Sequence, residues 1–422
     1  MTTHYPSTPQ GNCISILMLL YYSLWHVVVY LGAYGHFHAT ERWIIMPLSA
    51  PETTLVQYFA DLEDFRIDRN KKHLLVDIIV LAVCCTICGA NGFVEIAMVA
   101  QGKIDWFRTF LQLPNGIPSH DTFGRVFAHL RPEVLEEHFI AWVAATFPGT
   151  PAQQVAFDGK TVRRSADATN DMPALQMISA WAVDSGIVLG QMAVDPKSNE
   201  ITALPILIET IDVEGCDITA DAFHCQKETV ETIIDQKAAY TIAVKENQPH
   251  LYEDIATTFA KLREQADASL STYTTCEKDH GRIETRRYWV TARLDNLRTA
   301  DEWRDLQSIG MVESERIVEG KTMHETRYYI SCREPDAQAF GKRVRGQWSI
   351  ENSLHWVLDV ALREDESRIR KDHSAENMAV MRHIAVNLLR QEKTLKVGTQ
   401  AKRLRAASDN TYLGKVIRLT VG

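Results

Sequence analysis

The sequence predicts a mixed α/β (α+β) protein, in which a helical N-terminal region precedes a mixed sheet with helices on both faces. Two changes in hydrophobic period lead to this prediction. Residues 52–145 repeat apolar side chains at helical spacing, whereas short apolar runs begin to alternate with helices at residue 155. Residues 272–333 are rich in aromatic and β-branched side chains, which are typical of strands.

The composition describes a soluble globular protein of two or three domains. The chain has 422 residues, of which 45% are apolar and 23% are charged. Its formal net charge of −9 argues against a protein that coats nucleic acid without specificity, but it allows local basic patches. Eight irregularly spaced cysteines indicate reduced thiols and a cytoplasmic location.

The first 45 residues differ from the rest. Residues 14–35 contain no Asp, Glu, Lys or Arg and are long enough to span a membrane. Met46 opens a segment with the composition of a globular domain. We therefore expect residues 1–45 to be an apolar extension that results from an early start codon, so that no membrane partner is required. A genuine membrane anchor stays open as the alternative.

Residues 46–148 are expected to form a helical N-terminal domain with a possible role in DNA binding. Residues 73–90 are apolar on nearly all faces, which predicts a central buried helix. Ser119 follows a turn and is a good N-cap for a helix that includes Arg125 and His129. This turn and helix are compatible with a helix-turn-helix DNA reader, and equally with an ordinary capped helix.

Residues 149–391 are expected to form the main α/β domain. The first strand covers residues 154–159, and a hairpin covers residues 177–194. Helices and strands then alternate, which favours a mixed sheet. The remaining elements are a helix at 200–212, a strand at 216–222, a helix to 237, a strand at 240–245, a helix at 248–266, a β-rich insertion at about 270–335, a long amphipathic helix at 336–362 and a closing helix at 374–392. Residues 392–422 are expected to be a basic C-terminal tail.

Three carboxylates are candidates for a metal site. Asp158 and Asp221 each end a strand, and these two strands can lie side by side. Glu351 lies between Trp348 and Leu354 on the apolar face of the long helix, where a glutamate is unfavourable unless it is paired or bound to metal. Three carboxylates suit Mg²⁺, which prefers oxygen ligands and can cleave phosphodiesters.

Each of these assignments has an alternative. Glu351 could form a salt bridge with Arg345, and Asp359 is a reserve candidate for the third acid. The cations that follow Asp158 would hold DNA phosphates, or else form a charged solvent-facing turn. These cations are Lys160, Arg163 and Arg164.

Several ordered motifs resemble the DDE transposases of bacterial insertion sequences, in the branch of the H-repeat-associated proteins. The motifs include "FDGKTVRRS", "ITADAFHCQKETVETIIDQKAAYTIAVKENQPHL", "DHGRIETRRYWV" and "RGQWSIENSLHWVLDVALREDESRIRKDHSAENMAVMRHIAVNLLR". The resemblance covers about residues 150–391 and implies an RNase H-like domain. It also implies that Asp158, Asp221 and Glu351 form the catalytic and metal-binding triad, and that His280, Arg282 and Arg345 lie near DNA.

The resemblance implies a transposase that cuts DNA at the ends of an insertion sequence and joins them to target DNA. Two Mg²⁺ ions would serve the reaction, with Mn²⁺ as a substitute and no small-molecule cofactor. The partners would be double-stranded DNA, both terminal inverted repeats and target, and a second copy of the chain in a nucleoid-associated homodimer. Related transposases often carry Arg and Lys at the positions of Gln347 and Leu358, and Arg345 could replace the former. These departures imply that the handling of DNA ends differs from that of the relatives. The alternative function is that of an inactive or domesticated DNA-binding protein, although the presence of all three acids favours activity.

Overall fold

The computed structural model describes residues 54–148, 153–166, 173–195, 200–279, 282–319 and 321–419, and the structure of the protein is given for these residues. None of the helices within these ranges is both long and apolar enough to cross a membrane. The apolar extension at residues 1–45 and the predicted DNA contact His280 lie outside the described residues.

The N-terminal region is helical, as predicted. Its helices are α1 (Thr54–Phe59), α2 (Leu75–Ile87), α3 (Phe93–Gly102), α4 (Ile104–Phe107), α5 (His120–His129) and α6 (Pro132–Thr146). Helix α2 is buried along its whole length except at Val76, as its uniformly apolar sequence predicts. Its one acid, Asp77, accepts a hydrogen bond from the backbone of Leu113 at 2.9 Å. Ser119 caps α5 by accepting a hydrogen bond from the backbone of Thr122.

A nine-stranded mixed sheet forms the centre of the second half, in the order β3-β2-β1-β4-β5-β9-β8-β7-β6. Strands β1, β2 and β3 are antiparallel, whereas β1, β4 and β5 are parallel, which is the arrangement expected of an RNase H-like core. The core strands are β1 (Gln154–Val162), β2 (Leu175–Ala182), β3 (Ile187–Ala193), β4 (Asp217–Ala220) and β5 (Ala239–Val244).

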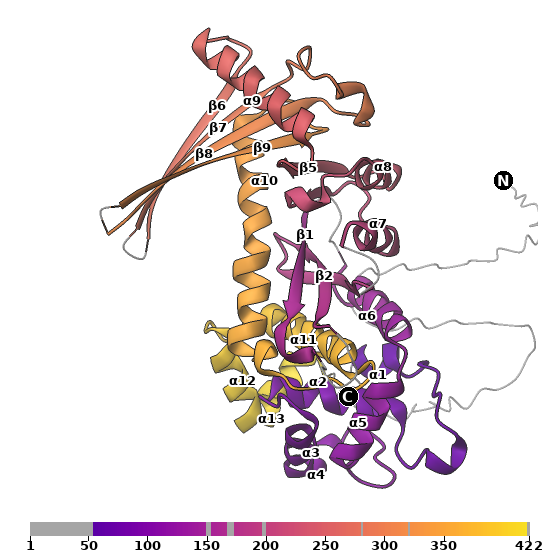
Figure 1. Ribbon diagram of the computed structural model, residues 1–422. Coiled ribbons are helices and arrows are strands. Elements are labelled where there is room, and N and C mark those ends of the chain that lie inside the picture. The colour runs from indigo at the N-terminus through magenta and orange to yellow at the C-terminus, as the bar shows by residue number, and fades with distance from the viewer. Residues whose placement is uncertain are drawn as a thin grey trace, which may run out of the picture. The chain divides into compact units, whose positions relative to one another are not determined.

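The predicted β insertion is a continuation of this sheet. Its strands are β6 (Ser271–Asp279), β7 (Arg282–Thr291), β8 (Ser308–Val318) and β9 (Lys321–Ser331). Strand β9 pairs with β5 from Thr241↔Ser331 to Val244↔Tyr328, so the insertion hydrogen-bonds directly to the core (Figure 1). We call β6–β9 the β ribbon.

Helices lie on both faces of the sheet, as predicted (Figure 1). Helix α10 (Ala337–Ile350) packs on β1, β4 and β7, while α7 (Glu200–Thr210) packs on β2 and β3. Helices α8 (Lys227–Asp235) and α9 (Pro249–Glu264) pack on β5 and β9 respectively. Helix α11 (Ser374–Gln391) connects the sheet with the N-terminal helices, because it contacts β3 as well as α2, α5 and α6.

The C-terminal segment differs from the expected basic tail. Residues 399–416 form α12 (Thr399–Ser408) and α13 (Asn410–Val416), which pack against α11, and α12 also packs against α2. Lys402 and Arg403 are buried because backbone carbonyls bind their charged ends: the ammonium of Lys402 donates to Leu389 O at 2.8 Å, and the guanidinium of Arg403 donates to Thr86 O at 3.0 Å. The basic residues at these two positions therefore join helices together, and neither can contact DNA.

Strand β3 lies at an edge of the sheet, and side chains of neighbouring helices satisfy part of its backbone. Asn387 of α11 is fully buried; its amide oxygen accepts from Val188 N at 2.8 Å and its amide nitrogen donates to Val188 O at 2.9 Å. Glu136 of α6 accepts from Gln191 N at 3.1 Å. These bonds replace part of a missing neighbouring strand and protect the edge from pairing with other chains.

Replacement of Asn387 by alanine would leave the buried N–H and C=O groups of Val188 without partners. We expect Asn387→Ala to lower the free energy of unfolding by about 2–4 kcal/mol, since each unsatisfied buried group costs about 1–3 kcal/mol. Urea denaturation measures the change. The exposed Asn296 supplies the control, because Asn296→Ala should change stability by less than about 0.5 kcal/mol. Equal losses in both variants would contradict this role of Asn387.

Candidate active site

The first two predicted acids lie on adjacent strands. The parallel register of β1 and β4 runs from Gln154↔Asp217 to Phe157↔Ala220. Asp158 directly follows Phe157, and Asp221 directly follows Ala220 at the end of β4. The two acids therefore come immediately after the last paired position of the two strands. This confirms the prediction that the two strands are neighbours. Asp221 is half-exposed and caps the following turn by accepting from Phe223 N at 3.2 Å.

Helix α10 is fixed along β1 by contacts that begin near its centre. Gln154 at the start of β1 donates its side-chain N–H to Arg343 O at 2.6 Å and to Thr219 Oγ1 at 2.9 Å. Gly346 lies directly over Gln154, and a methyl group at this position would overlap with the Gln154 amide. Helix α10 can approach β1 this closely because Gly346 has no side chain.

Further along, the same helix brings the third predicted acid toward the first. Gln347 donates to Phe157 O at 2.9 Å, and His355 Nδ1 lies 3.6 Å from Asp158 Oδ2. Glu351 is four residues after Gln347 and four residues before His355. It thus occupies the helical turn between two residues that both contact β1 at or beside Asp158.

Glu351 itself is exposed, so the prediction that it lies on the buried face was wrong. Trp348, which was taken to mark that face, is 38% exposed and stacks under the guanidinium of Arg327 at 4.3 Å. The predicted alternative, a salt bridge between Arg345 and Glu351, is also absent, because Arg345 binds Glu277 Oε2 at 2.6 Å. The side chain of Glu351 forms no ion pair or hydrogen bond with any described residue.

The predicted face was wrong because it was built on Trp348, whereas the buried positions here are Ile350, Leu354 and Leu358. The helix also changes type at Glu351, where the α-helix gives way to two π-helical segments, Glu351–His355 and Val357–Ala361. Single π-helical turns occur frequently at functional sites.

Glu351 lines a cleft of about 830 Å³ between α10 and the β ribbon, which we call the ribbon cleft. Two of the predicted DNA contacts, Arg282 and Arg345, line the same cleft. Three further arginines bring the cations on its walls to five: Arg286, Arg316 and Arg327. Several of these cations are neutralised, since Arg286 lies 2.7 Å from Glu284 and Arg345 binds Glu277.

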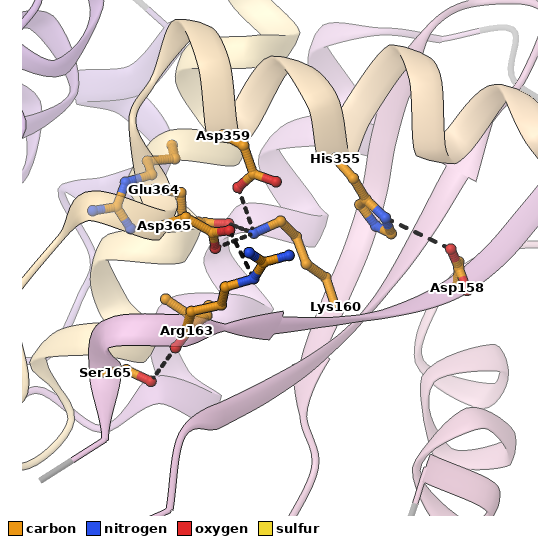
Figure 2. A network of polar contacts seen from close by, with 10 residues as sticks. Asp158, Lys160, Arg163, Ser165, His355, Asp359, Glu364 and Asp365 are labelled. Carbon is orange, nitrogen blue, oxygen red and sulfur yellow. Dashed lines mark hydrogen bonds and ion pairs between the residues drawn. The ribbon is translucent and has the colours of Figure 1, made fainter.

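The predicted DNA contact Lys160 has a different role. Its ammonium is 2.8 Å from Asp359 Oδ1, 3.0 Å from Glu364 Oε2 and 3.3 Å from Asp365 Oδ1 (Figure 2). Its side chain is only 10% exposed. We therefore correct the assignment: Lys160 is held by three carboxylates and is not available to a phosphate. Asp359, the reserve for the third acid, is likewise committed to this cluster.

The two arginines that follow remain near the surface. Arg163 is 79% exposed, and its Nε lies 3.2 Å from Asp365 Oδ2 (Figure 2). Arg164 is exposed, and its backbone carbonyl accepts from Arg370 Nε at 2.9 Å. Their assignment as DNA contacts stays a prediction.

Burial and charge set the protonation of this cluster. Burial alone would lower the pKa of Lys160, but the carboxylates of Glu364 and Asp359 outweigh it and raise the pKa. Burial raises the pKa of Asp359. Burial also raises the pKa of Glu364, but Arg382 and Lys160 outweigh it, so that the pKa lies below its ordinary value. Burial, reinforced by Lys160, lowers the pKa of His355 to about 4, so this imidazole is neutral at pH 7.

Asp158, Asp221 and Glu351 offer carboxylate oxygens, which suit a hard divalent cation. In the structure only Asp158 and Asp221 lie next to each other. Glu351 offers a carboxylate that forms no hydrogen bond or ion pair within the described ranges. Carboxylate oxygens are the ligands that Mg²⁺ prefers. Within the described ranges, however, no three His, Cys, Asp or Glu side chains are gathered closely enough to hold one ion as they stand.

Sequence reasoning missed the contacts of His355 and the cluster around Lys160. One signal was available: Lys160 lies two residues after Asp158, so both side chains project from the same face of β1. The partners of Lys160 are about 200 residues away in sequence, and nothing in the local pattern identifies them.

Replacement of Lys160 would leave buried carboxylates without their cation. We expect Lys160→Met to lower the free energy of unfolding at pH 7 by about 3–5 kcal/mol. Lys160 lowers the pKa values of Asp359 and Glu364, so without the ammonium these pKa values rise and the two groups take up protons as the pH falls from 7 to 5. In the unmodified chain Glu364 keeps a lowered pKa and stays ionised over this range. The destabilisation should therefore be smaller at pH 5 than at pH 7 in urea denaturation.

Lys227 provides the matched control, because its ion pair with Glu302 is half-exposed on both sides. Lys227→Met should cost less than about 1 kcal/mol at either pH, since exposed pairs contribute little. A loss in Lys160→Met that is no larger than this, or that does not depend on pH, would contradict the role assigned to the cluster.

Comparisons with known proteins agree with the two-part architecture. Residues 56–143 match the family described as "DDE_Tnp_1-associated", and residues 149–388 match the family described as "Transposase DDE domain". The H repeat-associated protein YhhI of Escherichia coli (strain K12) is 36% identical over 368 residues, which cover 86% of this chain and 97% of the relative.

Two further similarities differ in strength. An uncharacterized protein in the dhlA 3′ region of Xanthobacter autotrophicus is 40% identical over 271 residues, covering 63% of this chain and 90% of the relative. A piggyBac transposase synaptic complex with hairpin DNA, solved by cryo-EM, aligns with 86% of this chain and 77% of its own at 8% identity and a TM-score of 0.37. That second similarity is too weak to support an argument about function.

The "Transposase DDE domain" match covers more than half of the chain, and the YhhI similarity spans nearly the whole relative. The chain therefore belongs to the DDE transposase family.

Proposed function

We propose that this protein is an active, metal-dependent transposase that cuts DNA at the ends of an insertion sequence and joins them to target DNA. The observation that carries the proposal is the shared position of Asp158 and Asp221 at the ends of adjacent parallel strands, with Glu351 on the helical turn beside them. Membership of the DDE family implies the use of divalent metal.

Asp158, Asp221 and Glu351 would hold the metal, Mg²⁺ or Mn²⁺. Bound there, divalent ions would activate the attacking oxygen and stabilise the leaving oxygen. In the first reaction, water oxygen bonds to phosphorus while the bond from phosphorus to the 3′ oxygen breaks, leaving a 3′-hydroxyl. In the second, the oxygen of that hydroxyl bonds to a phosphorus of the target while the target's bond from phosphorus to its 3′ oxygen breaks, so that the element end is joined and a 3′-hydroxyl is left on the target strand.

The chain's own side chains would position the DNA and the acids. Arg282 and Arg345 face the ribbon cleft that holds Glu351, and Arg163 and Arg164 lie near the surface beyond Asp158. These cations are suited to backbone phosphates, which dominate the affinity of proteins for DNA. His355 would remain neutral, so it adds no positive charge beside Asp158 to compete with the metal. Pairing of two DNA ends by a homodimer is part of the same proposal.

A DNA-binding protein without catalysis is the second candidate. The observation that favours it is that the described residues hold no gathered set of three metal ligands. The two candidates differ in one measurable property, since both bind DNA and only the first cleaves it.

We expect Asp158→Asn, Asp221→Asn and Glu351→Gln each to reduce DNA cleavage by on the order of 10³-fold or more, because loss of a metal ligand removes several kcal/mol of transition-state stabilisation. The substrate would be duplex DNA that carries the sequences flanking the gene, with Mg²⁺ present. Removal of the metal by EDTA should abolish cleavage and strand transfer, and Mn²⁺ should restore both.

Asp235→Asn is the matched control, because Asp235 is exposed and its ion pair among the described residues is with Arg304. It should cleave at the normal rate. Normal cleavage by any of the three site variants would refute that residue's assignment. An unmodified chain that binds the duplex but does not cut it with either metal would establish the second candidate.

A further inference from the structure

We propose that a second cleft, distinct from the ribbon cleft, binds the phosphate backbone of duplex DNA. The inference rests on the proposed function. It adds a DNA-binding surface that lies outside the ribbon cleft. This second cleft lies between α5, residues 368–376 and the end of β4, and we call it the helical cleft. Its cations are Arg125, Arg368, Arg370 and Lys371.

The helical cleft reaches the candidate active site. Asp221 and Phe223 form part of its wall, and α5 contributes His120, Asp121, Gly124 and Arg125 from one helical face. Its volume is about 1990 Å³, whereas pockets for small ligands measure about 300–1,000 Å³. A macromolecular ligand therefore suits it better than a metabolite.

The charge state of its cations points to an anionic ligand. Arg125, Arg368, Arg370 and Lys371 are exposed, and none of them forms an ion pair with a carboxylate among the residues that the structure describes. Some exposed cations elsewhere have carboxylate partners, since Arg298 lies 2.9 Å from Asp254, whereas others, such as Lys261 and Lys342, form no ion pair with a described carboxylate. Four cations that lack carboxylates and line one cleft are available to phosphates, which arginine binds in a bidentate geometry.

The cations stand on segments that are tied to one another. His373 N donates to Ala128 O at 3.4 Å, which joins residues 368–376 to α5. Asn377 of α11 donates to Phe127 O at 2.8 Å and to Leu130 O at 2.9 Å, which fixes the end of α5. Their arrangement is therefore set before a ligand arrives, which lowers the cost of binding.

The acids that line the helical cleft repel a phosphate less strongly than their number suggests, because one of them is partly protonated. Glu376 and Glu133 both line it. Burial and the neighbouring Glu133 raise the pKa of Glu376 to about 7, so that Glu376 is partly protonated near neutral pH. Asp121, Asp195 and Asp372 also line the cleft and are expected to limit binding to positions beside the four cations.

The apolar side chains of the cleft are suited to the sugars of the DNA backbone. Phe223 is 44% exposed beside Asp221, and Val94 of α3 is 56% exposed. A duplex that lies along the cations would place its backbone at Asp221. The helical cleft would thus hold DNA on the Asp221 side, while the ribbon cleft holds it on the Glu351 side.

The test measures binding of the full chain to a 40-base-pair duplex taken from DNA that flanks the gene, in EDTA, at several salt concentrations. Each phosphate contact contributes about 0.9 to the slope of log affinity against log salt. We expect Arg368→Ala/Arg370→Ala/Lys371→Ala to weaken binding and to lower that slope by about 2.7. Arg125→Ala/Lys371→Ala, which keeps the bond from Arg370 to Arg164, should lower it by about 1.8.

The control removes three exposed cations that have carboxylate partners, in Lys237→Ala/Arg298→Ala/Arg304→Ala. It matches the charge change of the triple variant and should leave the slope unchanged. Circular dichroism melting verifies that all variants fold.

The inference would be overturned if both cleft variants showed the same slope of log affinity against log salt as the control. Because EDTA prevents cleavage, a chain that binds normally and never cuts would refute only the proposed catalysis. If the unmodified chain binds no duplex, the cleft inference and the proposed function fall together. The same measurement on one strand of this duplex forms a second arm, and a loss of binding in the cleft variants that is confined to the single strand would refute the assignment to duplex DNA.

Discussion

The alignment of α10 with β1 is the constraint on which the candidate active site depends. Gln154 holds the helix at Arg343, and Lys160 holds the π-helical end at Asp359. The two contacts are 16 residues apart on the helix and six residues apart on β1, so the helix is held along the strand at two places. Glu351 and Asp158 both lie between these two fixed ends, and their relative position follows from them.

The sequence could predict the strand-end acids because their signal is local. Each of Asp158 and Asp221 follows a short apolar run, and strand order then makes the two runs neighbours. The hairpin and the alternation of helices and strands were predictable for the same reason, since hydrophobic period reports on neighbouring residues.

What the sequence did not predict depends on non-local contacts or on irregular backbone. Glu351 was predicted to be buried because Trp348 was assigned to the apolar face, but Trp348 is exposed and stacks under Arg327 of the β ribbon, and the π-helical segments that begin at Glu351 have no signal in the hydrophobic period. Lys160 was assigned to DNA because its carboxylate partners are far away in the chain. The buried ends of Lys402 and Arg403 bind backbone carbonyls of other helices, whereas their sequence context resembled a solvated basic tail.

The edge of β3 has a consequence for the synthesis of this protein. Asn387, which satisfies Val188, is 199 residues further along the chain. A ribosome that adds about 5–20 residues per second needs about 10–40 s to reach it. During that interval the nascent β1–β3 meander leaves the ribosome with an open hydrogen-bonding edge. Early binding by a cellular chaperone would keep such strands from joining those of neighbouring nascent chains until α11 is made.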